Sequence, residues 1–346
     1  MSKRGTTLDT GNRFITTTRE KFDDGWESFT EEPDPQTQFL KDTSRTAFAT
    51  NTSPDIPFTH SINSYRGCEH GCTYCYARPT HEYLGFNAGL DFETKIMVKH
   101  DIAELARAEM LKKSWQPTIV SMSGVTDPYQ PCERTFGLSR EILKVMHQFK
   151  NPISIITKNA LVLRDIDILA EMAKENLASV FISITTLDRD LARRMEPRTS
   201  TPELRLKAIE KLSAAGVPVG VMMAPLIPGL TDNEIPELLK RVAEAGARNA
   251  YYVIVRLPLA VKPIFLNWLT REEPGRAEKI AHRLEEMRDG KLNRTEFGKR
   301  MVGEGAHAEM IRQIFKMSCR KYGLNKTNIH LSTDAFQRPG EQIGMF

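Results

Sequence analysis

From about residue 61 onwards, short runs of apolar residues alternate with longer stretches in which apolar residues recur at helical spacing. The short runs are rich in β-branched residues and predict six buried strands, at 61–65, 118–122, 153–157, 179–185, 217–224 and 250–255. The longer stretches predict helices between them, at 101–113, 138–149, 165–175, 202–214 and 233–244. Repeated strand–helix alternation implies parallel strands joined by right-handed crossovers. We therefore expect an α/β fold, either an open sheet or a partial barrel.

The segments on either side of this alternating region have different patterns. Residues 1–60 contain few periodic apolar positions and are rich in Thr, Asp and Pro, which predicts an irregular N-terminal arm. After residue 257 the pattern changes to two charged helical stretches, at 271–288 and 306–322. The sequence therefore predicts three parts: an arm over residues 1–60, a core barrel over 61–260 and a small helical C-terminal extension over 261–346.

Composition is that of an ordinary globular protein, since 40% of the 346 residues are hydrophobic and 27% are charged. The net charge of +4 is small, but residues 262–346 hold 16 basic and 11 acidic residues. This basic extension makes a nucleic acid one candidate partner, although basic residues without interleaved aromatics are more typical of a solvated surface.

The chain contains no apolar run of the roughly 18 residues that span a bilayer, and no apolar stretch follows its N-terminal basic residues. We therefore expect a cytoplasmic protein with no membrane partner.

The five cysteines are unevenly distributed along the chain. Cys68, Cys72 and Cys75 lie within eight positions, whereas Cys132 and Cys319 are isolated. An odd number of cysteines without a secretory signal argues against a disulfide framework, so the three clustered thiols are candidate ligands of a metal ion or cluster. They follow the first predicted strand, at the sheet edge where active sites of parallel α/β folds assemble.

Two kinds of inorganic site compete for these thiols. Zinc needs four ligands, and His70 or His81 could supply the fourth, but the spacing C-x3-C-x2-C matches no common zinc finger. An iron–sulfur cluster normally has four cysteine ligands. With three local cysteines, one iron is left open for a ligand from outside the protein, which is typical of a catalytic cluster.

At these residues the sequence resembles the radical S-adenosylmethionine (SAM) superfamily, with Tyr74 as the aromatic residue before the third cysteine. The resemblance implies a partial (β/α)6 barrel of the TIM type and a [4Fe-4S] cluster held by Cys68, Cys72 and Cys75. It also implies that SAM chelates the fourth iron, and that the reduced cluster cleaves SAM to a 5′-deoxyadenosyl radical that abstracts hydrogen from a substrate. The electron would come from an external low-potential donor of the flavodoxin or ferredoxin type.

The resemblance is narrower over residues 60–260. The segments at 65–76, 126–131 (TDPYQP), 156–158 (ITK), 164–165 (RD), 196–197 (EP) and 225–229 (PLIPG) are similar to the spore photoproduct lyase-like branch, which is often called DNA repair photolyase-like. This branch makes a nucleic acid the first candidate substrate, in a lyase or other radical reaction. A small metabolite or a peptide remains an alternative substrate, as does a metal-binding protein without catalysis, because a fold does not determine a function.

Residues after the second predicted strand are candidates to bind SAM. In the superfamily, a segment with a glycine and an acid at this position contacts the amino group of SAM. Gly124 would allow close backbone approach, and Thr126 and Asp127 offer oxygen acceptors for an ammonium group. The structural alternative is a helix cap or an Asx turn before Pro128.

Three further residues are candidate SAM contacts. Ser183 and Thr185 lie on one face of the fourth predicted strand, where hydroxyls facing a barrel interior suggest contacts to ribose or carboxylate. Thr is also common in strands for reasons of conformation alone. Arg194 is a candidate for the SAM carboxylate, because a guanidinium binds a carboxylate through two hydrogen bonds, but a solvated helix face would equally explain it.

Other side chains are candidates for the substrate cavity. Lys158 and Arg256 are charges at the ends of otherwise apolar strands, so each is expected to point into a polar cavity or to pair with a carboxylate. Cys132 and Tyr129 lie just after the second predicted strand. Cys132 is a candidate hydrogen-atom donor to a product radical, and Tyr129 a candidate radical relay, against the alternative of ordinary packing.

Overall fold

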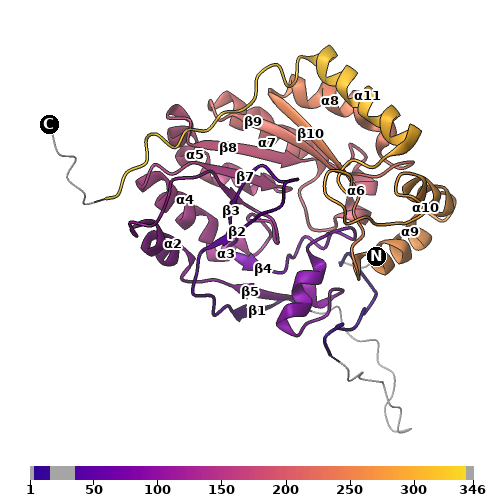
Figure 1. Cartoon of the computed structure of the whole chain (residues 1–346), viewed down its shortest axis with the longest axis horizontal. Coiled ribbons are helices and arrows are strands. Elements are labelled where there is room, and N and C mark those ends of the chain that lie inside the picture. The colour runs from indigo at the N-terminus through magenta and orange to yellow at the C-terminus, as the bar shows by residue number, and fades with distance from the viewer. Residues whose placement is uncertain (1–3, 16–35, 340–346) are drawn as a thin grey trace, which may run out of the picture.

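The computed structural model describes residues 4–15 and 36–339. Within these residues the chain forms a seven-stranded sheet in the order β10-β9-β8-β7-β6-β3-β2 (Figure 1). All neighbouring strands are parallel except β2 and β3, which are antiparallel. The strands are β2 (Phe48–Thr50), β3 (His60–Ile62), β6 (Val120–Met122), β7 (Ile153–Thr157), β8 (Ala178–Ser183), β9 (Val219–Leu226) and β10 (Asn249–Ile254).

Helices connect the parallel strands, as the sequence pattern predicts. They bury one apolar face each, as α4 does with Ile142, Leu143 and Met146. The crossover helices are α2 (Ile102–Met110), α4 (Leu138–Gln148), α5 (Ile166–Lys174), α7 (Pro202–Ala214) and α8 (Ile235–Glu244), all within a few residues of the expected ranges. The predicted α/β fold with six parallel strands is therefore confirmed, and the two ends of the sheet do not join.

A second, three-stranded sheet was not foreseen. It has the order β1-β5-β4 and contains β1 (Gln38–Lys41), β4 (Tyr65–Arg66) and β5 (Lys95–Val98). The predicted strand at 61–65 is therefore wrong as one element, because β3 ends at Ile62 while Tyr65 pairs antiparallel with Val98 in the other sheet. An apolar run indicates extended backbone, but it does not identify the partner strand.

The N-terminal arm, which was expected to be irregular, contains two short strands that were not foreseen. Strands β1 and β2 lie within it, and each is formed by pairing with a strand outside it, β5 and β3. These strands are short and carry exposed residues, so no local apolar alternation marks them. Residues 16–35 of the predicted arm lie outside the described residues, and the proposed division into three parts stays a prediction.

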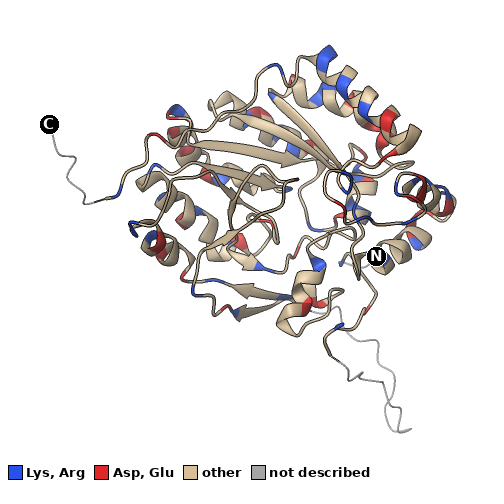
Figure 2. Ribbon diagram, viewed as in Figure 1, with Lys and Arg blue, Asp and Glu red and all other residues tan. Residues whose placement is uncertain are grey.

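The C-terminal region contains α9 (Val261–Glu272), α10 (Ala277–Glu286) and α11 (Gly305–Tyr322). The helix predicted at 271–288 starts too early, because its residues 277–286 form α10, whereas α9 ends before Pro274, which lacks an amide hydrogen and disfavours helix at the preceding residue. The predicted second helix corresponds to α11, which packs against α8 (Figure 1). Basic and acidic residues are mixed along α10 and α11 (Figure 2).

Short elements complete the described chain. They are η1 (Arg78–Leu84), α1 (Asp91–Thr94), α3 (Glu133–Phe136), η2 (Ala160–Asp165), α6 (Arg189–Met195) and η3 (Asp232–Glu234). The hydrophobic core is continuous from the sheet to the helices that cover it, with Ile155, Val180 and Val221 fully buried at its centre. Among the described residues, none of the helices combines the length and apolar character that crossing a bilayer requires.

Candidate active site

The clustered cysteines lie in the loop between β4 and η1. The amide of Cys68 donates to the carbonyl of Phe92 at 2.9 Å, and the amide of Cys75 donates to the carbonyl of Cys72 at 3.2 Å. Cys68 and Cys72 are buried, whereas Cys75 is half-buried. The loop therefore turns twice and brings the three thiols into one region beneath the surface.

Burial raises the pKa of Cys68 and Cys72 well above the usual thiol value. The neighbouring charges of Asp127, Cys72 and Cys75 raise the pKa of Cys68 further, so its thiol senses both other thiols. Burial also raises the pKa of Cys75, against the opposing effects of the Arg78 charge and of the Ala77 and Arg78 backbone amides. A nearby positive charge, such as that of bound metal ions, favours the ionised form of such thiols.

The donor set fits an iron–sulfur cluster better than a single metal ion. Within the described ranges, no group of three or more His, Cys, Asp or Glu side chains lies close enough to bind one ion. A [4Fe-4S] cluster takes each thiolate on a different iron and is stabilised by amide hydrogen bonds to sulfur, such as those offered to Cys75. The thiols of Cys68, Cys72 and Cys75 can therefore hold such a cluster.

Arg78 holds the cysteine loop from within the core. Its guanidinium donates to the carbonyl of Cys72 at 2.9 and 3.0 Å, and it forms an ion pair with Glu93 at 2.6 Å. Both side chains are fully buried. Glu93 also accepts hydrogen bonds from the amides of Gly5 and Thr6, at 2.8 and 3.1 Å. The N-terminal residues are thereby attached to the loop.

Two glycines make this attachment sterically possible. A Cβ atom added to Gly5 would lie 1.5 Å from the carbonyl oxygen of Gly71. Gly71 has a φ of +66°, and a Cβ there would lie 2.6 Å from Glu93 Oε2. A larger residue at either position would force the N-terminal segment away from the cysteine loop.

The carboxylate of Asp127 accepts hydrogen bonds from other groups of the chain. Oδ1 accepts hydrogen bonds from the amide of Tyr129 at 2.9 Å and the hydroxyl of Thr157 at 2.6 Å. Oδ2 accepts from the amide of Lys158 at 2.8 Å and lies 3.4 Å from His70 Nδ1. Burial opposes ionisation, but the His70 ring and these hydrogen bonds keep the pKa of Asp127 below its usual value. The expected contact from Asp127 to the SAM ammonium is therefore not supported, and the Asx turn before Pro128 is the observed role.

Thr126 has a similar structural role, and Gly124 a different one. The Thr126 hydroxyl donates to the carbonyl of Gly67 at 2.6 Å and accepts from Gln130 Nε2 at 2.9 Å, so it fastens the cysteine loop instead of facing a ligand. Gly124 has a φ of +124° with open space at its Cβ position. Its carbonyl accepts a hydrogen bond from the hydroxyl of Tyr76 at 2.8 Å. The Gly124 backbone thus lies beside the cysteine loop.

A buried polar network lies beyond Cys72. Glu196 forms an ion pair with Arg205 and accepts hydrogen bonds from the hydroxyls of Tyr74 and Thr185, the latter at 2.6 Å. Both side chains of the ion pair are essentially inaccessible to solvent. Thr185 therefore does not face a ligand as expected, because Glu196 takes its hydroxyl. Ser183, at the end of β8, is buried, and its carbonyl accepts from Arg205 at 2.9 Å.

Lys158 stands between this network and the cysteines. Its ammonium donates to the carbonyl of Ala224 at 2.8 Å and lies 3.6 Å from Glu196. Burial lowers the pKa of Lys158 to about 8, against the opposing influence of Cys72. The expectation that this strand-end charge enters a polar region and meets a carboxylate is confirmed.

Arg194 contacts residues at the end of α9 and not the ligand expected for it. Its guanidinium forms an ion pair with Glu273 at 2.8 Å and donates to the carbonyl of Glu272 at 2.9 Å, at the end of α9. The indole of Trp268 donates to the Arg194 carbonyl at 3.0 Å. Arg194 therefore joins α6 to α9, and the predicted contact with the SAM carboxylate is not supported.

Cys132 and Tyr129 are both buried beside the cysteine loop. Burial and the nearby carboxylates of Glu69 and Glu133 raise the pKa of Cys132, so its sulfur keeps its proton. The hydroxyl of Tyr129 donates to Asp165 at 3.1 Å, which together with burial raises the pKa of this phenol. Radical roles for these two residues stay predictions.

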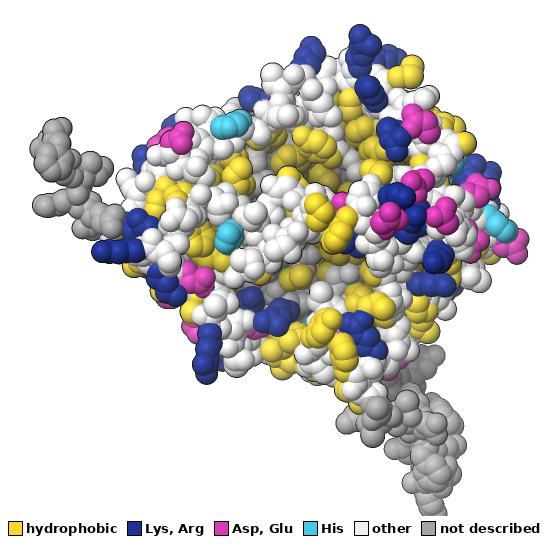
Figure 3. Space-filling view, viewed as in Figure 1, with side chains coloured by type: hydrophobic (Ala, Val, Ile, Leu, Met, Phe, Trp, Pro, Cys, Tyr) yellow, Lys and Arg dark blue, Asp and Glu magenta, His cyan; other side chains and the backbone are white. Residues whose placement is uncertain are grey.

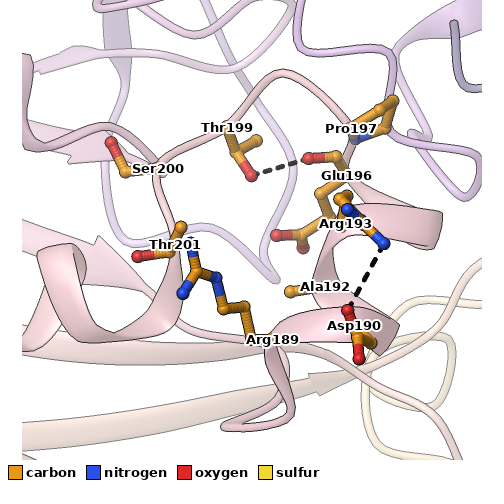
Figure 4. Close-up of a pocket in the computed structure, with 9 residues that line it drawn as sticks. All are labelled: Arg189, Asp190, Ala192, Arg193, Glu196, Pro197, Thr199, Ser200 and Thr201. Atoms are coloured by element: carbon orange, nitrogen blue, oxygen red, sulfur yellow. Dashed lines mark hydrogen bonds and ion pairs between the residues drawn. The ribbon is translucent and has the colours of Figure 1, made fainter. Parts of the chain in front are cut away.

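Two features mark the surface near these residues. A hollow near the centre of the face shown in Figure 3 has hydrophobic side chains at its floor. A cavity of about 170 Å³ lies between α6 and the start of α7 (Figure 4). The Thr199 hydroxyl donates to the Glu196 carbonyl at 2.8 Å beside it. The lining residues are Arg189, Asp190, Ala192, Arg193, Glu196, Pro197, Thr199, Ser200 and Thr201.

Comparison with known families identifies the chemistry. The profile of the radical SAM superfamily matches residues 62–242. The chain belongs to the radical SAM superfamily. Members of this superfamily use a [4Fe-4S] cluster and SAM and generally need an external reductant. The superfamily expected from the sequence is confirmed.

Relatives of this radical SAM superfamily member share part of its length. The uncharacterized protein Rv2578c of Mycobacterium tuberculosis is 40% identical over 221 residues, which cover 63% of this chain and 65% of the relative. The uncharacterized protein MJ0683 of Methanocaldococcus jannaschii is 28% identical over 222 residues, which cover 64% of this chain and 79% of the relative. The chain thus spans slightly less than two thirds of the mycobacterial relative that it matches.

Solved structures of spore photoproduct lyase share the fold. One, complexed with dinucleoside spore photoproduct, has a TM-score of 0.60 and 19% identity, covering 83% of this chain and 80% of that one. A double mutant with bound AdoMet and dinucleoside spore photoproduct has a TM-score of 0.59 and 17% identity over the same shares. The expected partial barrel and the resemblance to this branch are confirmed at the level of fold.

Proposed function

We propose that Cys68, Cys72 and Cys75 hold a [4Fe-4S] cluster whose fourth iron binds SAM. The observation that carries this proposal is the set of three thiols in one loop, two buried and one half-buried, with backbone amides directed at the Cys75 sulfur. When bound, the reduced cluster supplies the electron that cleaves SAM to methionine and a 5′-deoxyadenosyl radical, which abstracts hydrogen from the substrate. The chain's own residues bind and orient these groups.

Lys158 is the cation that offsets the negative charge of the thiolates. It is mostly buried, and its charge influences the ionisation of Cys72. Glu196, fixed by Arg205, lies 3.6 Å from the Lys158 ammonium and restricts its position. We assign Lys158 to the SAM carboxylate in place of Arg194, and the Gly124 backbone and Ser183 to further contacts with SAM.

The proposed substrate is a nucleic acid, and the proposed reaction is a lyase-type radical transformation. Support comes from the fold shared with spore photoproduct lyase and from the excess of basic residues in 262–346. Cys132, whose thiol keeps its proton, is the proposed donor of a hydrogen atom to the product radical, with Tyr129 as a relay. We assign the electron donor to the flavodoxin or ferredoxin type.

Anaerobic reconstitution tests the cluster assignment. We expect about four irons and four sulfides per chain, as a four-iron cluster requires, and 5′-deoxyadenosine on reduction with dithionite in the presence of SAM. Cys72→Ala should lose both, because only two thiolates remain. Cys319→Ala is the matched control, since this buried thiol lies on α11 and should not affect either value. Full SAM cleavage by the Cys72→Ala variant would refute the assignment.

The role of Lys158 is tested by SAM binding to the reconstituted enzyme. Lys158→Met keeps the length of the side chain and removes the charge. We expect SAM affinity to fall roughly tenfold or more, because a hydrogen bond to a charged group contributes about 1.5–3 kcal/mol. Lys174→Met, at an exposed position, is the control and should bind SAM as the wild type does. Equal affinities of the two variants would remove Lys158 from the SAM site.

A further inference from the structure

Arg256 carries a half-buried charge at the carboxyl edge of the sheet, and no carboxylate among the described residues forms an ion pair with it. It lies two residues beyond the end of β10, and among the described residues its buried Nε has no hydrogen-bond partner. Its guanidinium carbon lies 5.9 Å from the centre of the Tyr76 ring. Tyr76 follows Cys75 directly and donates its hydroxyl to the Gly124 carbonyl. Arg256 therefore lies at the mouth of the proposed SAM site.

Two other arginines lie near Arg256. Arg300 forms an ion pair with Asp55 and donates to the hydroxyl of Ser53 at 2.6 Å. Arg288 is fully buried and donates to the carbonyls of Leu292, at 2.6 Å, and Val255. The charge of Arg256 acts on Arg288, and the charge of Arg300 acts on Arg256.

This arrangement has more positive than negative charge. Within the described part of the chain, the carboxylate that acts on Arg256 is Asp55, which is already paired with Arg300. Burial lowers the pKa of Arg256 most, and repulsion from Arg300 lowers it further. The guanidinium group nevertheless remains charged, as it does in proteins generally. A desolvated charge without a counter-ion is costly, so the site is completed by an anion from outside the chain.

Exposed aromatic rings beside these cations indicate what the anion belongs to. Tyr76 is 53% exposed and Phe297 is 55% exposed. The guanidinium of Arg300 lies 4.5 Å from the centre of the Phe297 ring. Sites for unpaired nucleotides usually combine guanidinium groups, which bind phosphate, with aromatic rings, which stack on the bases. A carboxylate ligand alone would not explain the exposed rings.

We propose that Arg256 binds a phosphate group of a nucleotide-containing substrate, with the rings of Tyr76 and Phe297 available to its bases. This inference rests on the proposed function, because it places the substrate beside the cysteine loop. Asp55 holds Arg300, and Arg288 donates to the carbonyl of Val255, the residue before Arg256, so we expect neither to touch the ligand.

Equilibrium binding to the full-length protein tests the proposal, with inorganic phosphate, thymidylyl-thymidine and thymidine as probes. We expect binding of the first two and at least tenfold weaker binding of thymidine. Arg256→Gln should weaken phosphate and thymidylyl-thymidine at least tenfold, and Arg256→Lys should weaken them less. Arg320→Gln, at an exposed position on α11, is the control of equal charge change and should bind as the wild type does. Unchanged phosphate binding by a folded Arg256→Gln variant would overturn the proposal.

Competition separates this site from the SAM site. Phosphate and SAM should bind the reconstituted wild-type enzyme together, with neither affinity changed by more than about twofold. Mutual exclusion would place Arg256 in the SAM site and overturn the inference. The binding experiments need no turnover, so a wild type that binds phosphate through Arg256 but fails to cleave SAM would refute the proposed function alone.

Discussion

Replacing Arg78 with methionine removes the cation that holds the cysteine loop in the core. The guanidinium donates to the carbonyls of Cys72, Ala88 and Gly89 and pairs with Glu93. In the variant, Glu93 keeps the hydrogen bonds from the amides of Gly5 and Thr6 but loses its counter-charge. Because methionine has no donor and reaches only about as far as the arginine Nε, the change removes the interaction, keeps the packing of the aliphatic part and leaves the volume of the guanidinium unfilled.

The expected cost follows from the burial of the pair. Both side chains of Arg78 and Glu93 are fully inaccessible to solvent, and removing one partner of a buried ion pair costs about 3–5 kcal/mol. The side chains of Lys174 and Glu171 are 67% and 57% exposed, and such a pair contributes about 0–1 kcal/mol. Arg78→Met should therefore destabilise the protein several times more than Lys174→Met.

Urea unfolding followed by circular dichroism measures both variants, using the full chain without its cluster. The double variant Arg78→Met/Glu93→Leu should be less destabilised than the sum of its single changes, because it leaves neither charge unpaired in the core. A free energy of unfolding for Arg78→Met that is no lower than that of Lys174→Met would refute the reasoning. So would strict additivity in the double variant.

Two further predictions concern His81 and Arg194. Burial lowers the pKa of His81 from its ordinary 6.5 to about 4, so the unfolded chain binds a proton that the folded chain excludes between these pH values. Stability should therefore fall as pH falls from 6.5 to 4, by up to about 3 kcal/mol, and His81→Leu should show a smaller loss in urea unfolding; equal losses would contradict the assignment. Arg194→Met should keep SAM affinity and lose about 1 kcal/mol of stability, because its partners lie on α9. A tenfold loss of SAM affinity in equilibrium binding would return Arg194 to the SAM site.

The local sequence pattern was sufficient for β7 and α7. β7 occupies the predicted range 153–157 because its apolar residues form one short run of the kind that builds a buried strand. α7 occupies 202–214 because Thr201 and Pro202 mark its start. By contrast, β1, β2 and β4 depend on pairing with distant segments, which residue spacing does not encode.

The candidate site divides in the same way. The cysteine spacing predicts a cluster because its chemistry needs neighbouring thiols in one loop. Asp127 and Thr185 are polar residues near the site. Their hydrogen-bond partners come from other strands and loops, so these side chains stabilise the structure around the site. Arg78 with Glu93, and Glu196 with Arg205, gave no sequence signal of pairing, because a charged residue has the same appearance in a sequence whether its side chain is paired or solvated.

The sequence by itself determined the alternating α/β fold, the ordinary charge balance and the cysteine loop, because these depend on residue types at short spacing. The tertiary structure alone decided which charges are paired. It placed Arg78 and Arg205 against buried carboxylates, Arg194 of α6 against the end of α9, and Arg256 beside Tyr76 with no carboxylate paired to it among the described residues. The physical reason is that the energy of a charge depends on its burial and on the groups that surround it, and both are created by contacts between segments far apart in the chain.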